Sequence, residues 1–226
     1  MSNPLDIDLQ ALWLTLKVAS WATVVALMLG VAGGWVVARG RWPGKRLLEA
    51  LLTLPMVLPP TVLGYYLIVV LGRNAPLGRW LSTHLGINLM FTWQGAVIAA
   101  SVVAFPLVFT SARAAFENVN ADFEKAARVL GAGELKVFLH VTLPLAMRGI
   151  AAGSMLAFAR AMGEFGATLM IAGNIPGKTQ TLSMAIYDAV QSGNDELANV
   201  LVIVISALCI VILVSASHLL NPRSDR

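Results

Sequence analysis

The sequence is poor in charged residues, which make up 12% of its 226 residues, against about 25% in ordinary soluble domains. Hydrophobic residues make up 58% of the chain, and the mean hydropathy is +0.76. A water-soluble protein of this size would have too few polar side chains to cover its surface. The composition therefore excludes a soluble globular domain and predicts that lipid covers much of the folded chain.

Cysteine and histidine are also scarce. The single Cys209 excludes a disulfide within the chain, and its place in an apolar run is typical of a small buried hydrophobe. His84, His140 and His218 lie far apart, without the spacing of a metal site. Since no nucleophile and base form a catalytic pattern either, we expect no metal, no cofactor bound by this chain and no enzymatic activity. Residues 1–8 contain no Lys or Arg, so we expect the first apolar run to stay in the membrane and not to be cleaved as a signal peptide.

Long apolar runs are what the sequence does contain. A membrane-spanning helix needs about 20 mostly apolar residues. The runs that qualify cover residues 12–38, 47–71, 89–112, 149–172 and 197–219. The predicted fold is an all-α integral membrane bundle of about five transmembrane helices, which forms a single domain over residues 10–220.

Lys and Arg are divided unevenly between the connections. The loop after the first run, the segment 113–148 and the C-terminal tail hold most of them, whereas the opposite connections hold Arg73, Arg79 and Lys178. Because cytoplasmic loops carry the excess of basic residues, the N-terminus is predicted to be periplasmic and the C-terminus cytoplasmic. The net charge of +4 is therefore attributed to orientation in the membrane and not to nucleic-acid binding.

The predicted cytoplasmic segment 113–148 mixes acidic and basic residues with Ala and Leu. Such a composition favours short amphipathic helices, which lie on the membrane surface or dock a soluble partner. The small Ala126 and Ala127 allow another surface to approach closely, and Gly131 is expected to end the helix in a conformation that other residues resist. Pro144 is expected to set the start of the next span. The alternative is an ordinary surface helix between two spans.

The order of residues in this segment resembles a known motif. Glu124-Lys125-Ala126-Ala127 leads to Gly131, and Val141-Thr142-Leu143-Pro144 follows, which is similar to the Glu-Ala-Ala, Gly and Ile-x-Leu-Pro pattern of the EAA loop of ABC importer permeases. Lys125 replaces the Glu of the triplet and Val141 replaces the Ile, whereas Glu124 supplies a carboxylate one position early. The side chain that pairs with a partner is therefore left open. The resemblance implies that the loop couples to an ATPase subunit through Glu124, Lys125, Ala126, Ala127, Gly131, Val141, Leu143 and Pro144.

Two further stretches resemble the molybdate branch of this family: residues 58–66, and residues 163–168 leading into 172–181. Sulfate permeases also carry a Gly-Glu-Phe-Gly element, so the oxyanion class is better supported than the particular anion. The resemblance implies the permease of an ATP-driven importer for molybdate or tungstate in a bacterial inner membrane. Two copies would form the pathway, with two ATP-binding subunits that hold the ATP and a periplasmic molybdate-binding protein.

Candidate pathway residues lie in the second and fourth runs. Pro55, Pro59 and Pro60 interrupt the second run, and broken membrane helices often mark transport sites, although a packing kink is an equal alternative. Arg160 and Glu164 share one helical face. A gating or structural pair is favoured over a substrate ligand, because a buried carboxylate repels a dianion. Two alternatives are a pair that bonds only with itself and a Glu164 that is hydrated at the outer interface. The candidates are Pro59, Pro60, Thr61, Gly64, Arg160, Glu164 and Thr168.

The stretch 173–179 resembles a phosphate-binding P-loop, but it has one residue too few between its glycines and no preceding strand, so a polar outward-facing turn is expected. The pairs Gly30/Gly34 and Gly149/Gly153 are expected to pack helices closely within the subunit. The alternative functions are a sulfate or thiosulfate importer permease, an ATP-independent channel or carrier, and an intramembrane enzyme.

Overall fold

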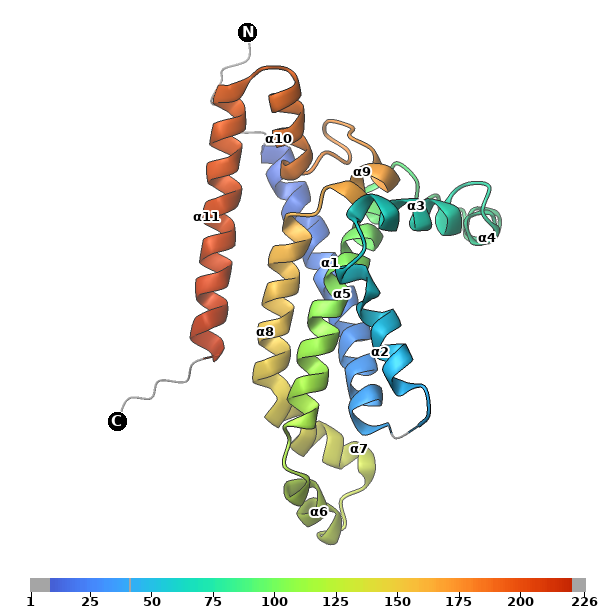
Figure 1. Cartoon of the computed structure of the whole chain (residues 1–226), viewed down its shortest axis with the longest axis vertical. Coiled ribbons are helices and arrows are strands. Elements are labelled where there is room, and N and C mark those ends of the chain that lie inside the picture. Colours follow the sequence, from blue (N-terminus) through green and yellow to red (C-terminus); the bar gives the residue numbers. More distant parts are fainter. Residues whose placement is uncertain (1–8, 41, 221–226) are drawn as a thin grey trace.

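Long helices run side by side along the long axis of the protein (Figure 1). The computed structural model describes residues 9–40 and 42–220, and within these ranges every regular element is a helix. The long helices are α1 (Leu9–Arg39), α5 (Trp93–Glu117), α8 (Leu143–Met162) and α11 (Asp195–Leu220). By length and apolar composition, α1, α5 and α11 can each cross a membrane. They confirm the predicted spans 12–38, 89–112 and 197–219.

The second predicted span is sharply bent. α2 (Lys45–Thr53) continues into a short 3-10 turn, η1 (Leu54–Met56), and α3 (Pro60–Leu71) leaves at an angle of 108°. The break lies at Pro55, Pro59 and Pro60, which lack the N–H that an unbroken helix requires. The expectation of one helix over residues 47–71 is therefore corrected to a bent pair, which is a broken span or a re-entrant loop. α3 and α4 (Pro76–Leu85) project sideways from the bundle (Figure 1).

The fourth predicted span, residues 149–172, is wrong at both ends. α7 (Glu134–Val137), the π-helical turn η2 (Phe138–Thr142) and α8 form one continuous helix of 29 residues. At 1.5 Å per residue this helix is roughly 43 Å long. It ends at Met162, and residues 163–165 separate it from the short α9 (Gly166–Ala172). The apolar run did not indicate the start of this helix at Glu134, because the first turns are polar on one face. It also did not indicate the break at residues 163–165, because the flanking residues are apolar.

Short helices lie at both ends of the bundle (Figure 1). α6 (Ala121–Val129) lies at one end, together with α7 and the connection from α1 to α2. α9 and α10 (Leu182–Gln191) lie toward the other end. α1 begins at the α10 end, whereas α11 ends toward the α6 end. The first described helix therefore begins at one end of the bundle, and the last described helix ends toward the other.

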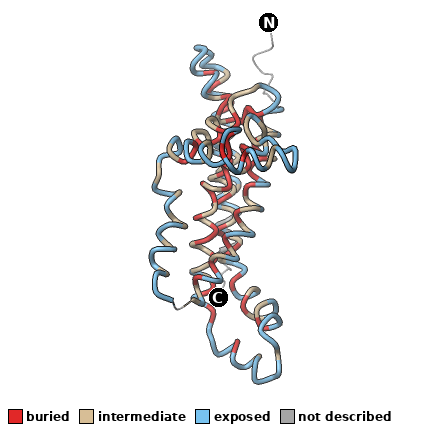
Figure 2. Tube along the Cα trace, turned by 90° about the vertical axis from the view of Figure 1, so that its right-hand side faces the viewer, coloured by how far each residue is buried: buried red, intermediate tan, exposed pale blue. Residues whose placement is uncertain are grey.

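Small side chains let α1 and α8 approach α5, and the buried residues follow this interior (Figure 2). A Cβ atom on Gly34 would lie 2.9 Å from the backbone nitrogen of Arg113 in α5. Cβ atoms on Gly30, Gly149 and Gly153 would lie within 2.9 Å of α5 side chains. Both small-xxx-small pairs therefore pack within the subunit, as predicted.

Replacing Gly34 by Ala is expected to destabilise the bundle by about 1–3 kcal/mol, because the added methyl group must push α1 away from α5. Gly33 is a matched control, since a Cβ there would meet the Phe109 ring at an ordinary 3.5 Å. Gly33→Ala is expected to be neutral or stabilising by up to about 1 kcal/mol, as Ala favours helix over Gly. Thermal unfolding of both variants in detergent checks this, and equal melting temperatures would contradict the close approach.

Candidate functional site

The helix that carries the EAA-like residues has a defined start and end. At its start the side chain of Asn120 accepts a hydrogen bond of 2.9 Å from the backbone N–H of Asp122. At its end Gly131 adopts a φ of 84°. The N–H of Gly131 donates to the carbonyl of Arg128 at 2.9 Å, and the N–H of Ala132 donates to that of Ala127 at 3.1 Å. This is a Schellman arrangement, and it confirms Gly131 as the residue that ends the helix.

Glu124 lies inside the chain, although its neighbours along α6 face outward. It is 3% exposed. Its Oε1 atom accepts hydrogen bonds from the guanidinium of Arg39, at the end of α1, and from Oγ1 of Thr142 at 2.6 Å. Nη2 of Arg128 lies 4.0 Å from the other carboxylate oxygen. The sequence left open whether the Glu124 carboxylate contacts a partner. In the structure this carboxylate interacts with three groups of the chain itself.

The outer surface of the loop includes an apolar patch. We define the docking knob as Phe123, Val129 and Leu130; Val129 and Leu130 are each 87% exposed, and Phe123 is also exposed. Lys125 and Ala126 are exposed beside them, and Ala127 is half-buried. The sequence analysis missed the three knob residues, although large apolar side chains in an otherwise charged segment are a usable signal. Such a patch at a bundle end is a candidate contact surface for another molecule.

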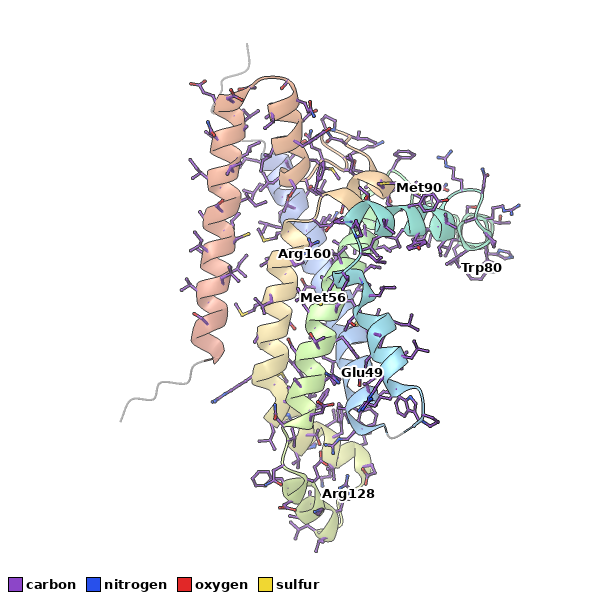
Figure 3. The ribbon with its side chains drawn as sticks, viewed as in Figure 1. Glu49, Met56, Trp80, Met90, Arg128 and Arg160 are labelled. Atoms are coloured by element: carbon purple, nitrogen blue, oxygen red, sulfur yellow. The ribbon has the colours of Figure 1, made fainter. Side chains whose placement is uncertain are left out.

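A second ion pair, between Arg128 and Glu134, stabilises the loop. Nε and Nη2 of Arg128 donate to the two carboxylate oxygens of Glu134 at 2.6 and 3.1 Å, so the pair is bidentate. The hydrogen bond that Arg128 donates to Glu134 raises the pKa of Arg128 above its ordinary value. Arg128 lies in α6 at the extremity of the molecule (Figure 3). The pair joins α6 to α7 across the turn at Gly131.

Pro144 lies in the first turn of α8, as expected, but α8 continues directly from α7 and η2, so the proline does not begin a separate helix. It lies within the continuous helix from Glu134 to Met162, directly after the π-helical turn η2. A proline inside a helix has no N–H for the carbonyl four residues earlier, and a π-turn is one way to absorb that mismatch. The N–H of Leu143 accordingly donates to the carbonyl of Phe138. Val141 and Leu143 are half-buried, so they pack within the chain and are not part of the knob.

The pathway candidates of the second run divide into two groups. Pro59, Pro60 and Thr61 are exposed at the start of α3. Gly64 is buried, and a Cβ atom on it would lie 2.8 Å from Cβ of Met170 in α9. The absence of a side chain at Gly64 therefore lets α3 approach α9 closely. Thr168 in α9 is buried, and its hydroxyl has no hydrogen-bond partner among the described residues.

Arg160 and Glu164 form the predicted pair. Nη1 of Arg160 donates to Oε2 of Glu164 at 2.9 Å, and the backbone N–H of Ala167 donates to Oε1 at 3.0 Å. Glu164 is 3% exposed, so it is not the hydrated carboxylate of the alternative. It lies in the break after α8, where it holds the start of α9 as well as the guanidinium.

The guanidinium of Arg160 reaches the bend of the second run. A pocket of about 170 Å³ is lined by Arg160 and by Pro55, Met56 and Pro60 from the bend, and Arg160 is the only charged residue among the described residues that line it. Arg160 and Met56 lie close together in Figure 3. The sequence indicated the prolines and the arginine separately, and the fold brings them together in one pocket.

The stretch 173–179 is a turn closed by its own side chain. Oγ1 of Thr179 donates to the carbonyl of Gly173 and accepts from the N–H of Ile175, each at 3.1 Å. It follows α9 and no strand, as expected for a polar turn rather than a P-loop. Among the described residues, no group of three His, Cys, Asp or Glu side chains could hold a metal ion.

Sequence comparisons relate most of the chain to known transport proteins. A family model described as "Binding-protein-dependent transport system inner membrane component" matches residues 22–226. The chain is 45% identical over 212 residues to the molybdenum transport system permease protein ModB of Escherichia coli (strain K12), covering 93% of both chains. It is 34% identical over 205 residues to the sulfate transport system permease protein CysT of the same organism, covering 91% of this chain and 74% of CysT.

Solved structures show the same fold. The MetNI methionine ABC transporter in inward-facing conformations matches with a TM-score of 0.73 at 18% identity, covering 97% of this chain and 98% of that one. A bacterial alginate ABC transporter, in complex with its alginate pentasaccharide-bound periplasmic protein, matches with a TM-score of 0.74 at 15% identity, covering 94% and 78%. At these identities the likeness concerns the fold alone. The chain is a multi-pass membrane protein with the fold of ABC importer permeases, and it belongs to the family of binding-protein-dependent transport system inner membrane components.

Proposed function

We propose that this chain is the permease subunit of an ATP-driven importer for molybdate and tungstate. The observation that carries the proposal is a single helix, from Glu134 to Met162, that starts at the turn after the docking knob and reaches Arg160, which lines the pocket at the bend of the second run. The higher identity to a molybdenum permease than to a sulfate permease favours molybdate over the sulfate or thiosulfate alternative.

In the proposed orientation the knob lies in the cytoplasm of a bacterial inner membrane. The loop after α1 and the segment 113–148 lie at the same end of the bundle and hold most of the basic residues, which favours a cytoplasmic location. The end with α9 and α10 then faces the periplasm. The N-terminus is on that side, and the C-terminus is on the cytoplasmic side.

The proposed partners follow from this orientation. Two copies of the chain form the pathway, and each presents its docking knob to one of two ATPase subunits, where ATP is bound and hydrolysed. The exposed Val129 and Leu130 support this docking, because a permanently water-exposed apolar tip is unfavourable unless a partner covers it. A periplasmic binding protein delivers the oxyanion at the opposite end. An ATP-independent channel or carrier would have no use for such a knob.

The proposed mechanism is a lever. Closure of the ATPase pair moves the docked loops, and the continuous helix carries this movement to the break at residues 163–165 and the pocket beside it. There the Arg160 guanidinium attracts the oxyanion, while Glu164 offsets part of its charge so that the anion is not held too tightly. ATP and the loaded binding protein bias the same bundle toward opposite openings.

Uptake in proteoliposomes tests this function. Vesicles would contain the chain with its ATPase and binding protein, with and without enclosed ATP, and would receive molybdate, tungstate and sulfate in competition. We expect ATP-dependent uptake of molybdate that tungstate inhibits and that a roughly 100-fold excess of sulfate reduces less than about twofold, a discrimination of about 3 kcal/mol or more. Inhibition by equimolar sulfate would assign the chain to sulfate import, and uptake without ATP would overturn the proposal.

A further inference from the structure

Glu124 joins parts of the chain that are far apart in sequence. The carboxylate lies in α6, its Arg39 partner is the last residue of α1, and its Thr142 partner lies in η2. The side chain of Glu124 is 4% exposed, whereas those of its helix neighbours Asp122 and Lys125 are 76% and 69% exposed. Glu124 is therefore oriented into the protein at a point of the loop where α1, α6 and η2 meet.

The surroundings of Glu124 are matched to a negative charge. Arg39 and Arg128 contribute two guanidinium groups, and the Thr142 hydroxyl donates a third contact at 2.6 Å. The position of Arg39 at the C-terminal end of α1 also suits a cation there. A buried carboxylate with partners of this kind is stable only as a set, because removing one member leaves the others uncompensated.

Without this contact α6 would be attached through its two ends and, by the Arg128–Glu134 pair and by packing, to the neighbouring α7 and η2. Residues 118–120 connect it to α5, and the turn at residues 130–133, which contains Gly131 and Gly133, connects it to α7. Both connections are short non-helical segments, about which a helix can turn. α1 packs against α5 and α8 along the bundle, so a bond from α6 to α1 ties the loop to the whole core.

We propose that Glu124 is a positioning residue that fastens α6 to α1 through Arg39, so that force on the docking knob moves α1, α5 and α8 together. Glu124 does not contact the ATPase subunit, whose contact is the apolar knob. This inference rests on the proposed function and assigns to the motif carboxylate an internal role. Its loss leaves docking intact but lets α6 turn on its connections, so ATP is hydrolysed with little transport.

The proposed role of Glu124 is tested with three variants: Glu124→Gln, Arg39→Gln and the double variant. Asp122→Asn is a matched carboxylate-to-amide control on the exposed face of the same helix. Two quantities would be measured: the Kd of the chain for its ATPase subunit, and the molybdate taken up per ATP hydrolysed. We expect each single variant to lower uptake per ATP about 10-fold or more while Kd changes less than about threefold. The double variant is expected to be no worse than either single one, because both remove the same interaction. Asp122→Asn is expected to behave as the wild type.

The conservative variants Arg39→Lys and Thr142→Val keep the test decisive if the glutamine variants fail to insert. Each weakens the contact without removing the buried carboxylate, and we expect uptake per ATP to fall about two- to fivefold at unchanged Kd. If Glu124→Gln weakened ATPase binding 10-fold and Arg39→Gln did not, Glu124 would contact the ATPase subunit directly. That result would overturn the proposed role of Glu124. Full coupling in the conservative variants, or losses that add in the double variant, would overturn it as well. Lack of ATP-dependent uptake by the wild type would instead refute the proposed function.

Discussion

Leu130→Asp is expected to abolish ATP-driven uptake while leaving the membrane bundle folded. Leu130 is 87% exposed at the end of α6, so the substitution removes little packing within the chain. In the complex it would bury an unpaired carboxylate, which costs about 2–5 kcal/mol and weakens binding of the ATPase subunit roughly 30- to 5,000-fold. Titration of the ATPase subunit onto the chain in lipid nanodiscs measures this change directly.

Leu130→Met is the matched control for this variant, because it preserves apolar volume. We expect its affinity for the ATPase subunit to stay within about tenfold of the wild type, since volume-conserving swaps usually cost less than about 1.5 kcal/mol. Thermal unfolding of both variants separates docking from folding. If Leu130→Asp bound the ATPase subunit as tightly as the wild type, the docking knob would be wrongly assigned.

Arg160→Gln is expected to lower molybdate uptake about 30-fold or more at unchanged ATPase binding. Arg160 is the one charged residue among the described residues that line the pocket at the bend. Its removal takes away the attraction for the oxyanion and leaves the Glu164 carboxylate buried without its guanidinium, facing a dianion of the same sign. Uptake rates at several molybdate concentrations, together with ATPase binding, measure the effect.

The double variant Arg160→Gln/Glu164→Gln separates the two roles of the arginine. The amide oxygen at position 164 can still accept from Ala167, so the start of α9 stays held, and the buried charge is gone. We expect the double variant to regain the thermal stability of the wild type but to keep its low uptake. Recovery of uptake would show that Arg160 serves only to neutralise Glu164, which is the self-contained pair among the original alternatives.

The sequence alone determined the class of the protein and most of its membrane helices. Apolar runs such as 12–38 and 197–219 define spans without reference to any other part of the chain, because each residue is compared with lipid and not with a neighbour. The role of Gly131 in ending α6 was also predictable from local sequence, since it depends on the φ preference of a single residue. The prolines indicated the break in the second run for the same reason.

Tertiary structure decided what depends on distant partners. The direction of the 108° bend and the meeting of Met56 with Arg160 depend on how α2, α3 and α8 pack. The close approach of α9 to Gly64 is likewise visible only in the fold. Glu124 and Arg39 are 85 positions apart, so nothing local distinguishes a buried ion pair from an exposed carboxylate. Hydropathy and backbone preference are properties of short segments, whereas charge compensation in a buried site is a property of the packed bundle.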